Sequence, residues 1–245
     1  MIATRRQDGR RADQLRAVRI VPGFVPPADG SCLIELGGTR VICTASFEPG
    51  VPDWMVGKGA GWVTGEYGML PASGGRRKQR PIGKPDSRAT EISRLIGRVL
   101  RSVARMDRMG ENTIWLDCDV LTADGGTRTA AVTGAYVALV QAARSLARRG
   151  LMPADVADRP VAAVSVGIVD GRALLDLNYQ EDVRAEVDMN VAMAADGRFV
   201  ELQATGEADR FDEGQLHRML GLARRGIRRL LVEQKQAIAA RERKH

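Results

Sequence analysis

A pair of glycines between a β-type and an α-type pattern constrains the fold of this chain more than any other feature. Residues 113–121 alternate between apolar and polar side chains, which predicts a strand. Residues 130–146 are small and apolar over a length typical of a helix. The hexapeptide DGGTRT at 124–129 lies between them. The sequence therefore predicts a strand that turns at glycines directly into the start of a long helix.

The start of such a helix is suited to an anion. Its first N–H groups have no partner within the helix, the macrodipole is positive there, and glycines let a ligand approach the backbone closely. Thr127 adds a hydroxyl and Arg128 a cationic fork, so Gly126, Thr127 and Arg128 are candidate phosphate-binding residues. A glycine turn that is capped by Asp124 or Thr127 and binds no ligand explains the same letters. The segment matches neither the dinucleotide fingerprint nor the P-loop.

The letters GGTR occur a second time, at residues 37–40, and β-rich residues follow at 41–45. Because no helix pattern begins there, we expect this copy to be a hairpin turn between two strands and not a binding site.

Two segments are rich in cations. The loop-like residues 72–87 carry several within five positions, namely Arg76, Arg77, Lys78 and Arg80. A solvated loop and a contact with a nucleic-acid backbone both fit, and we favour the contact. Residues 1–20 are equally rich in arginine and are either a solvated arm or a further contact.

A helix is predicted over residues 87–103, with Ser87 as its N-cap and Arg88 in its first turn. The macrodipole does not favour a cation at that position. Arg88 is therefore either a ligand for an anion or an ordinary surface arginine.

Two carboxylates lie six positions apart near a strand-like segment. Asp188 and Asn190 alternate with apolar residues, which predicts a strand that turns both polar side chains to one face. Asp182 lies in an acidic loop before this strand, and the two aspartates converge on one cleft if the loop turns back. Such a pair suits general acid–base chemistry or the binding of Mg²⁺. A turn residue and a solvent-facing strand residue are the alternative.

Composition bears on partners and compartment. The 245 residues include 37 basic and 30 acidic side chains, and the net charge of +7 favours a polyanionic partner or a small anionic substrate. Three cysteines in apolar runs, without the spacing of a disulfide framework, indicate reduced thiols in a cytoplasmic protein. No secretory signal opens the chain and no apolar run approaches about 18 residues, so we expect no membrane association.

The order of the elements predicts an α+β fold. Strand-like segments followed by a helix occur in residues 1–150 and again in residues 151–245. We therefore expect one domain, 1–245, that is built from two similar βα halves.

Several motifs taken together resemble the bacterial ribonuclease PH family, and the likeness runs from about Arg10 to the last helix. They are DGR at 8–10, VICTA at 41–45, GWVT at 61–64, EY at 66–67, MLP at 69–71, EISRLIGR at 91–98, DCDVL at 117–121, ADGGTRTA at 123–130, DLNY at 176–179, ED at 181–182 and VDMNV at 187–191. Their number and order make the resemblance specific.

The resemblance implies a phosphate-dependent 3′→5′ exoribonuclease that trims the 3′ ends of tRNA precursors and other RNA, including rRNA. It would release nucleoside 5′-diphosphates and run in reverse as a nucleotidyltransferase. The resemblance also implies two halves of the ribosomal-protein-S5 domain 2-like fold, inorganic phosphate as co-substrate, Mg²⁺, a homohexamer that is a trimer of dimers, and a cytoplasmic location.

The same resemblance assigns site residues. Arg88 and the Gly126-Thr127-Arg128 turn would bind phosphate, and Asp182 and Asp188 would be catalytic and hold the metal. The RNA-guiding residues would be Arg76, Arg77, Lys78 and Arg80.

The chain departs from the family in the basic loop, where many members have arginine directly after the Met-Leu-Pro segment and this chain has Ala72. Ser87 and Ala89 replace the usual Gly and Thr around Arg88. These differences bear on individual RNA contacts and not on the reaction. 

Two other classes of protein were weighed. A non-catalytic ring subunit of an exosome-like assembly tends to lack the phosphate arginine or the aspartates, which are all present here. A hydrolytic nuclease would use Asp182 and Asp188 as metal ligands, and the phosphate site argues against it.

Overall fold

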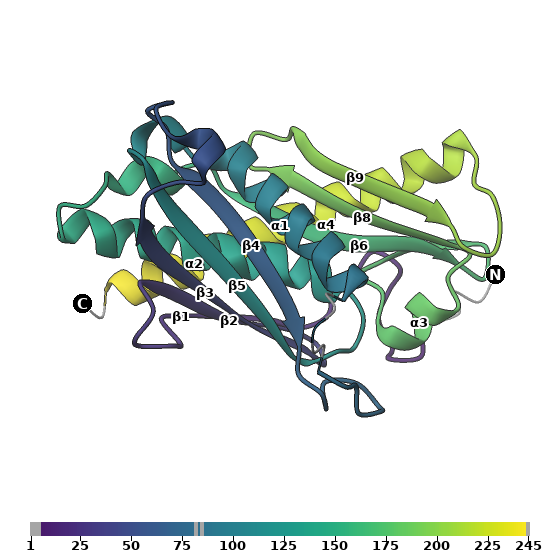
Figure 1. Ribbon diagram of the computed structural model, residues 1–245. Helices are drawn as coiled ribbons and strands as arrows, with labels where there is room; N and C mark the ends of the chain where they lie inside the picture. Colours follow the sequence, from purple (N-terminus) through teal and green to yellow (C-terminus); the bar gives the residue numbers. More distant parts are fainter. Residues whose placement is uncertain (1–5, 81–82, 84–85, 244–245) are drawn as a thin grey trace.

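The first half of the protein is a five-stranded sheet with one crossover helix. The structure is a computed structural model that describes residues 6–80, 83 and 86–243 (Figure 1). The strand order is β1-β2-β3-β5-β4, and all neighbours are antiparallel except β4 and β5. Because a parallel pair needs a crossover, α1 joins β4 to β5 and packs on β4. The bounds are β1 Val18–Pro22, β2 Gly30–Leu36, β3 Thr39–Pro49, β4 Trp62–Met69, α1 Ser87–Val103 and β5 Asn112–Thr122.

The second half is a four-stranded antiparallel sheet in the order β7-β6-β8-β9. Its helix α4 packs on β6 and β7 and also on β1 of the first sheet, so the last helix contacts both halves. The bounds are β6 Val161–Val169, β7 Arg172–Leu175, α3 Tyr179–Val183, β8 Val187–Ala194, β9 Phe199–Gly206 and α4 Glu213–Glu242. Short 3-10 helices occur at Asp53–Met55, Met106–Arg108 and Ala154–Ala157.

Helix α2 (Thr127–Arg148) packs against both sheets and forms the centre of one continuous core (Figure 1). Its small residues allow close approach, and a Cβ on Gly134 would come within 2.8 Å of Cys43 Sγ. Polar groups tie it to its neighbours. Thr133 Oγ1 accepts from the Ala163 N–H of β6 at 3.0 Å, and Gln234 of α4 donates to the Thr133 carbonyl at 2.9 Å. The two sheets and α4 are therefore joined through α2.

By length and composition alone the 22-residue helix α2 could also cross a membrane. The expectation that no apolar segment approaches such a length is therefore wrong for this helix. In the structure 78% of an 18-residue window of this helix is buried inside the molecule. With that degree of burial, α2 is a core helix of this fold.

The α+β class and the two βα halves are confirmed. The first GGTR segment is the expected hairpin turn, since β2 and β3 pair antiparallel with Leu36 opposite Thr39. Cys32, Cys43 and Cys118 are free and buried, as the sequence indicates. Residues 81–82 and 84–85 of the basic loop lie outside the described residues.

Two local expectations are corrected, and one strand was not predicted. The N-cap of α1 is Asp86 and not Ser87, because Asp86 Oδ1 accepts from the Arg88 N–H at 2.9 Å. Strand β4 was not expected in a segment with several glycines. Its Gly65 packs against α1, where a Cβ would lie 2.8 Å from Ile96 Cγ2, so a glycine is needed for this close contact. Asp182 lies on the short helix α3 and not on a loop.

Candidate active site

Among the long helices of the described residues, α2 is the one whose first turn an anion could bind in place of a cap. Gly126 is the N-cap residue, in a left-handed conformation with φ of 65°, and no side chain in the described part of the chain caps this helix. By contrast, α1 and α4 are capped by Asp86 and Asp212. The Thr127 hydroxyl accepts from Tyr67 Oη at 2.8 Å and so faces β4. The alternative of a turn closed by Asp124 or Thr127 as a cap is wrong.

Two arginines reach the same cavity from the starts of two helices. Arg128, the second residue of α2, is held at 3.0 Å from Glu91 Oε1 and at 2.9 Å from Gln203 Oε1. Arg88, the second residue of α1, is exposed and lines the cavity. Burial raises the pKa of Asp182, and both guanidinium groups oppose that rise. An anion at the start of α2 would thus meet two cations, one already oriented by polar partners.

The acidic pair faces these arginines from the second half of the protein. Burial, together with the neighbouring Asp182 carboxylate, raises the pKa of Asp188 to about 6. Burial also raises the pKa of Asp182. Asn190 donates to Asp188 Oδ2 at 3.1 Å, whereas Asp188 Oδ1 is buried and has no donor among the described residues. The predicted strand face with Asp188 and Asn190 is confirmed, since both line the cavity.

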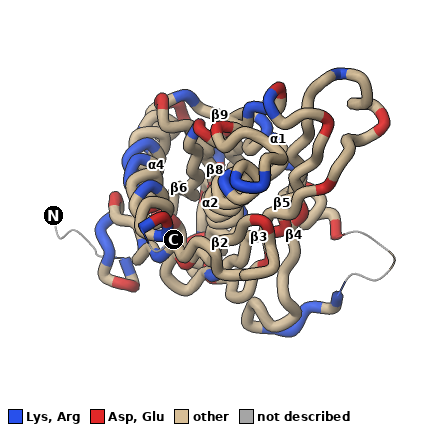
Figure 2. Tube along the Cα trace, turned by 90° about the vertical axis from the view of Figure 1, so that its left-hand side faces the viewer, with Lys and Arg blue, Asp and Glu red and all other residues tan. Residues whose placement is uncertain are grey.

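The basic loop contributes part of its charge to the cavity. Arg76, Arg77 and Lys78 line it, whereas Arg80 is not among the lining residues. The loop stands away from the body of the molecule in Figure 2, next to the grey trace. Its base is anchored because the Ala123 N–H donates to the Ser73 carbonyl at 2.7 Å, one residue before the glycine turn. This hydrogen bond therefore links the base of the loop to the segment that leads into α2.

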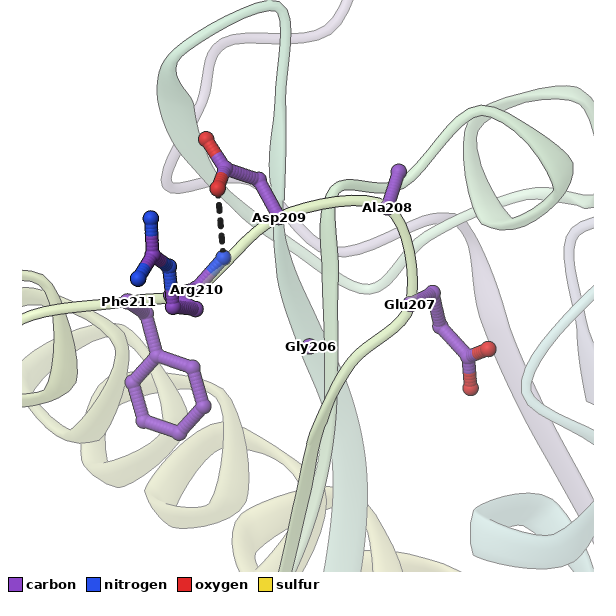
Figure 3. Close-up of a pocket in the computed structure, with 6 residues that line it drawn as sticks. All are labelled: Gly206, Glu207, Ala208, Asp209, Arg210 and Phe211. Atoms are coloured by element: carbon purple, nitrogen blue, oxygen red, sulfur yellow. Dashed lines mark hydrogen bonds between the residues drawn. The ribbon is translucent and has the colours of Figure 1, made fainter.

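The cavity that these groups line has a volume of about 1100 Å³. It extends from the basic loop past the start of α2 to the acidic pair. A second hollow of about 550 Å³ lies beside it and is formed by residues 206–211 after β9 (Figure 3). Six consecutive residues of one loop make this hollow, and Glu207 is the lining residue that both share. The larger cavity is the candidate active site, because it alone gathers the predicted cations and carboxylates.

Three arginines of the N-terminal segment are buried, so the expectation of a solvated arm or an RNA contact is wrong for them, whereas Arg11 and Arg19 are exposed. Arg6, Arg10 and Arg16 are each 7% exposed. They are paired with the buried carboxylates of Asp176 and Glu181. Removing one member would leave an uncompensated buried charge, so these residues hold the structure together.

This buried network also positions the site. Arg16 donates to the carbonyls of Asp124 and Gly125, and its Nη2 lies 2.7 Å from Asp176 Oδ1. Thr39, from the first GGTR copy, donates to the Gly125 carbonyl at 2.7 Å and accepts from the Asp124 N–H at 2.9 Å. The glycine turn before α2 is thus clamped from two sides, which preorganises its amide groups for a ligand.

Comparison with known proteins assigns the family. The model of the 3′ exoribonuclease family, domain 1, matches residues 14–145, and that of domain 2 matches residues 159–226. The chain belongs to the 3′ exoribonuclease family. Family members named ribonuclease PH are 55% identical in Corynebacterium efficiens, over 95% of this chain and 96% of the relative, and 51% identical in Syntrophomonas wolfei, over 94% and 97%.

Solved structures of the family share the fold at low identity. A chain of the Archaeoglobus fulgidus exosome with RNA bound to the active site matches with a TM-score of 0.79 and 22% identity, over 93% of this chain and 91% of that one. Rice (Oryza sativa) Rrp46 matches with a TM-score of 0.78 and 17% identity, over 96% and 100%. The resemblance seen in the motifs is therefore confirmed at the level of family and fold.

The oxygen atoms of the acidic pair fit a divalent cation such as Mg²⁺. The described residues contain no group of three or more His, Cys, Asp or Glu side chains that could hold a metal. Mg²⁺, however, is commonly bound by one or two carboxylates together with water and substrate phosphate. Asp182, Asp188 and the donor-free Asp188 Oδ1 provide such a partial set.

The sequence brought several residues of the site to notice and missed others. Those missed are Arg16, Thr39, Tyr67, Asp124 as a backbone acceptor, Asp176, Glu181 as an ion-pair partner and Gln203. Only the density of arginine near the N-terminus gave a signal, and a charge run by itself does not distinguish a buried ion pair from a solvated face.

Proposed function

We propose that this member of the 3′ exoribonuclease family shortens RNA from its 3′ end by phosphorolysis, and that the cavity at the start of α2 is its active site. The single observation that carries the proposal is the uncapped start of α2 beside Arg88 and Arg128, within one cavity with Asp182 and Asp188. Its substrates would be tRNA precursors and other RNA with free 3′ ends, including rRNA.

Orthophosphate binds at the start of α2 through the backbone amides of residues 126–128 and the Thr127 hydroxyl. Arg128 and Arg88 balance its charge and orient it. One phosphate oxygen attacks the phosphorus of the terminal phosphodiester. The bond to the 3′-oxygen of the preceding nucleotide breaks, and a nucleoside 5′-diphosphate leaves. Because one phosphate ester bond is exchanged for an anhydride, the reaction also runs in reverse as nucleotidyl transfer.

Asp188 supplies the proton to the departing 3′-oxygen. A carboxyl with a pKa of about 6 retains part of its protons near neutral pH, which an ordinary aspartate does not. Burial, together with the negative charge of Asp182, keeps that pKa high. In the alternative role, ionised Asp188 together with Asp182 would hold Mg²⁺, which would supply neutralisation of the charge that develops on the phosphoryl oxygens.

Cations of the loop would guide the RNA backbone into the cavity. Arg76, Arg77 and Lys78 do so at the cavity wall, and Arg80 would act further out, since it is absent from the lining.

Whole-molecule features complete the proposal. The chain would work as one unit, 1–245, with halves 1–150 and 151–245, in the cytoplasm and as a homohexamer built from three dimers. A solution mass of about 160 kDa, six times the 26.6 kDa chain, is expected, and a monomer mass would contradict the ring.

The test of the reaction is RNA with a free 3′ end incubated with and without phosphate. Nucleoside diphosphates that form only with phosphate are expected. Monophosphates formed without phosphate would instead support a hydrolase, and no product under either condition would support a non-catalytic subunit.

A variant tests the phosphate site. Arg128→Ala should lower kcat/KM for phosphate by about 30- to 1000-fold, the loss typical of an anion clamp in the transition state. Arg94→Ala, which removes an exposed arginine of α1 outside the cavity, serves as the control. Equal phosphate kinetics in the two variants would overturn the assignment.

A further inference from the structure

Helix α3 turns an apolar face into the candidate active site. Tyr179 is 59% exposed and Val183 is 66% exposed, and both line the large cavity. They lie four positions apart and so share one face of the helix. A large exposed ring beside phosphate- and RNA-binding groups is not explained by packing, because the ring contributes little to the core.

Aromatic side chains are also rare in this chain and in the lining of the cavity. Only 4% of the chain is aromatic, and Tyr179 is the one aromatic residue among those described as lining the cavity. Aromatic side chains recognise single-stranded RNA because every nucleobase offers a flat face for stacking. The remaining wall combines charged and polar groups with small or aliphatic residues, so it can hold the backbone of RNA but offers no ring to a base.

The support beneath Tyr179 is rigid and is coupled to the phosphate site. Asn178 and Glu181 form a capping box at the start of α3, and Glu181 is itself held by Arg6. The Tyr179 N–H donates to Asp124 Oδ1 at 3.3 Å. A Cβ on Gly125 would lie 2.9 Å from the Tyr179 nitrogen, so the two backbones are in contact. The side chain of Tyr179 therefore begins next to the glycine turn that would hold phosphate.

We propose that Tyr179, flanked by Val183, is the stacking platform for the nucleobase of the 3′-terminal nucleotide. This inference rests on the proposed function. Phosphate at the start of α2 must lie next to the terminal phosphodiester, so the base attached to that nucleotide is the one within reach of α3. Stacking accepts all four bases and favours the larger purines, which suits an enzyme that removes nucleotides one after another.

The experiment compares two RNAs that differ only at the 3′ end, one with a terminal adenosine and one with a terminal abasic ribonucleotide. On the adenosine-ended RNA, Tyr179→Ala should raise KM by about 5- to 150-fold, the range that one base–aromatic stack contributes. Tyr179→Phe keeps the ring and should behave like the wild type. Phe24→Ala removes an exposed ring outside the cavity and should have no effect.

On the abasic RNA, the wild type and Tyr179→Ala should have the same KM, because the stack is already missing. The KM for phosphate should be equal in both proteins. An equal loss on both RNAs, or no loss on either, would overturn the platform, and the first result would mean that Tyr179 acts on the fold.

Two further outcomes bear on the proposed function and on the assembly of the protein. A wild type that yields no diphosphate with phosphate present refutes the proposed function itself and not the platform alone. A change in solution mass for Tyr179→Ala would mean that the face is covered by another copy of the chain, and this too would overturn the inference.

Discussion

Asp188 is held in an environment that opposes its ionised form. Its carboxyl has an ordinary pKa of 3.8 in the unfolded chain and a pKa of about 6 in the folded protein. Because the folded pKa is the higher one, ionising Asp188 destabilises the folded state. This cost is fully present above about pH 6 and disappears as the pH falls below about 4.

Asp188→Asn should therefore raise the free energy of unfolding at pH 7, by roughly 1–3 kcal/mol, since the amide carries no charge to bury. The gain should vanish when unfolding is measured near pH 4. Asp107→Asn, which replaces an exposed carboxylate outside the cavity, should change stability by less than about 0.5 kcal/mol at either pH. A variant that is destabilised at pH 7 would contradict the pKa of Asp188 in the folded protein.

The same pKa predicts the pH dependence of phosphorolysis. If Asp188 is the general acid, its protonated form is required, and kcat should fall as the pH rises through about 6. If its main role is to hold a cation, the ionised form is required and kcat should rise through the same region. A pH profile of kcat at saturating phosphate and RNA distinguishes the two, and a rising limb would refute the acid role.

Among the elements, the clamp on the glycine turn offers a test that leaves every charged group in place. Thr39→Val replaces the hydroxyl by a methyl group of nearly the same volume. The Asp124 N–H and the Gly125 carbonyl then lose this hydrogen-bond partner. We expect a loss of about 1–3 kcal/mol in the free energy of unfolding. We also expect a higher KM for phosphate with little change in the KM for RNA.

Thr44→Val is the matched control, because Thr44 lies on the same strand and faces away from the turn, partly exposed. Measurements of chemical unfolding and of phosphate kinetics on both variants would decide the matter. If Thr39→Val and Thr44→Val behave alike, the glycine turn before α2 does not depend on the hydrogen bonds of Thr39.

The elements also explain what the sequence could and could not predict. Long periodic segments such as α1 and β5 were predicted almost to the residue, because their patterns follow the helical and strand periods. β4 was missed because Gly65 and Gly68 are breakers in sequence, whereas in the fold Gly65 makes room for α1. α3 has five residues, too few for a helical period to be recognised.

At the site, the sequence predicted the groups that carry charge and missed those that position them. Arg128 and Asp188 lie in motifs with a chemical signature. Arg16, by contrast, acts on Asp176, which lies 160 positions away along the chain. No local pattern records a contact at such a distance, so only the folded structure reveals which arginines are buried.

For the molecule as a whole, charge predicts how RNA affinity depends on salt. Each phosphate contact with a single strand contributes about 0.7 to the slope of log K against log salt. Replacing Arg76, Arg77 and Lys78 together by alanine should therefore reduce the slope by about 2. Replacing the exposed Arg218, Arg225 and Lys235 of α4 removes the same charge outside the cavity and should leave the slope nearly unchanged. Equal slopes for both triple variants would mean that the loop only adds to the overall charge.

The position of α2 has a consequence for any attempt to divide the protein. One side of this helix is covered by residues before position 150 and another side by residues after it. Expressed alone, residues 1–150 would expose an apolar strip of alanine, valine and leucine side chains to water. We expect this fragment to precipitate or to bind chaperones. Co-expression of the two fragments should restore solubility, as in a split reporter.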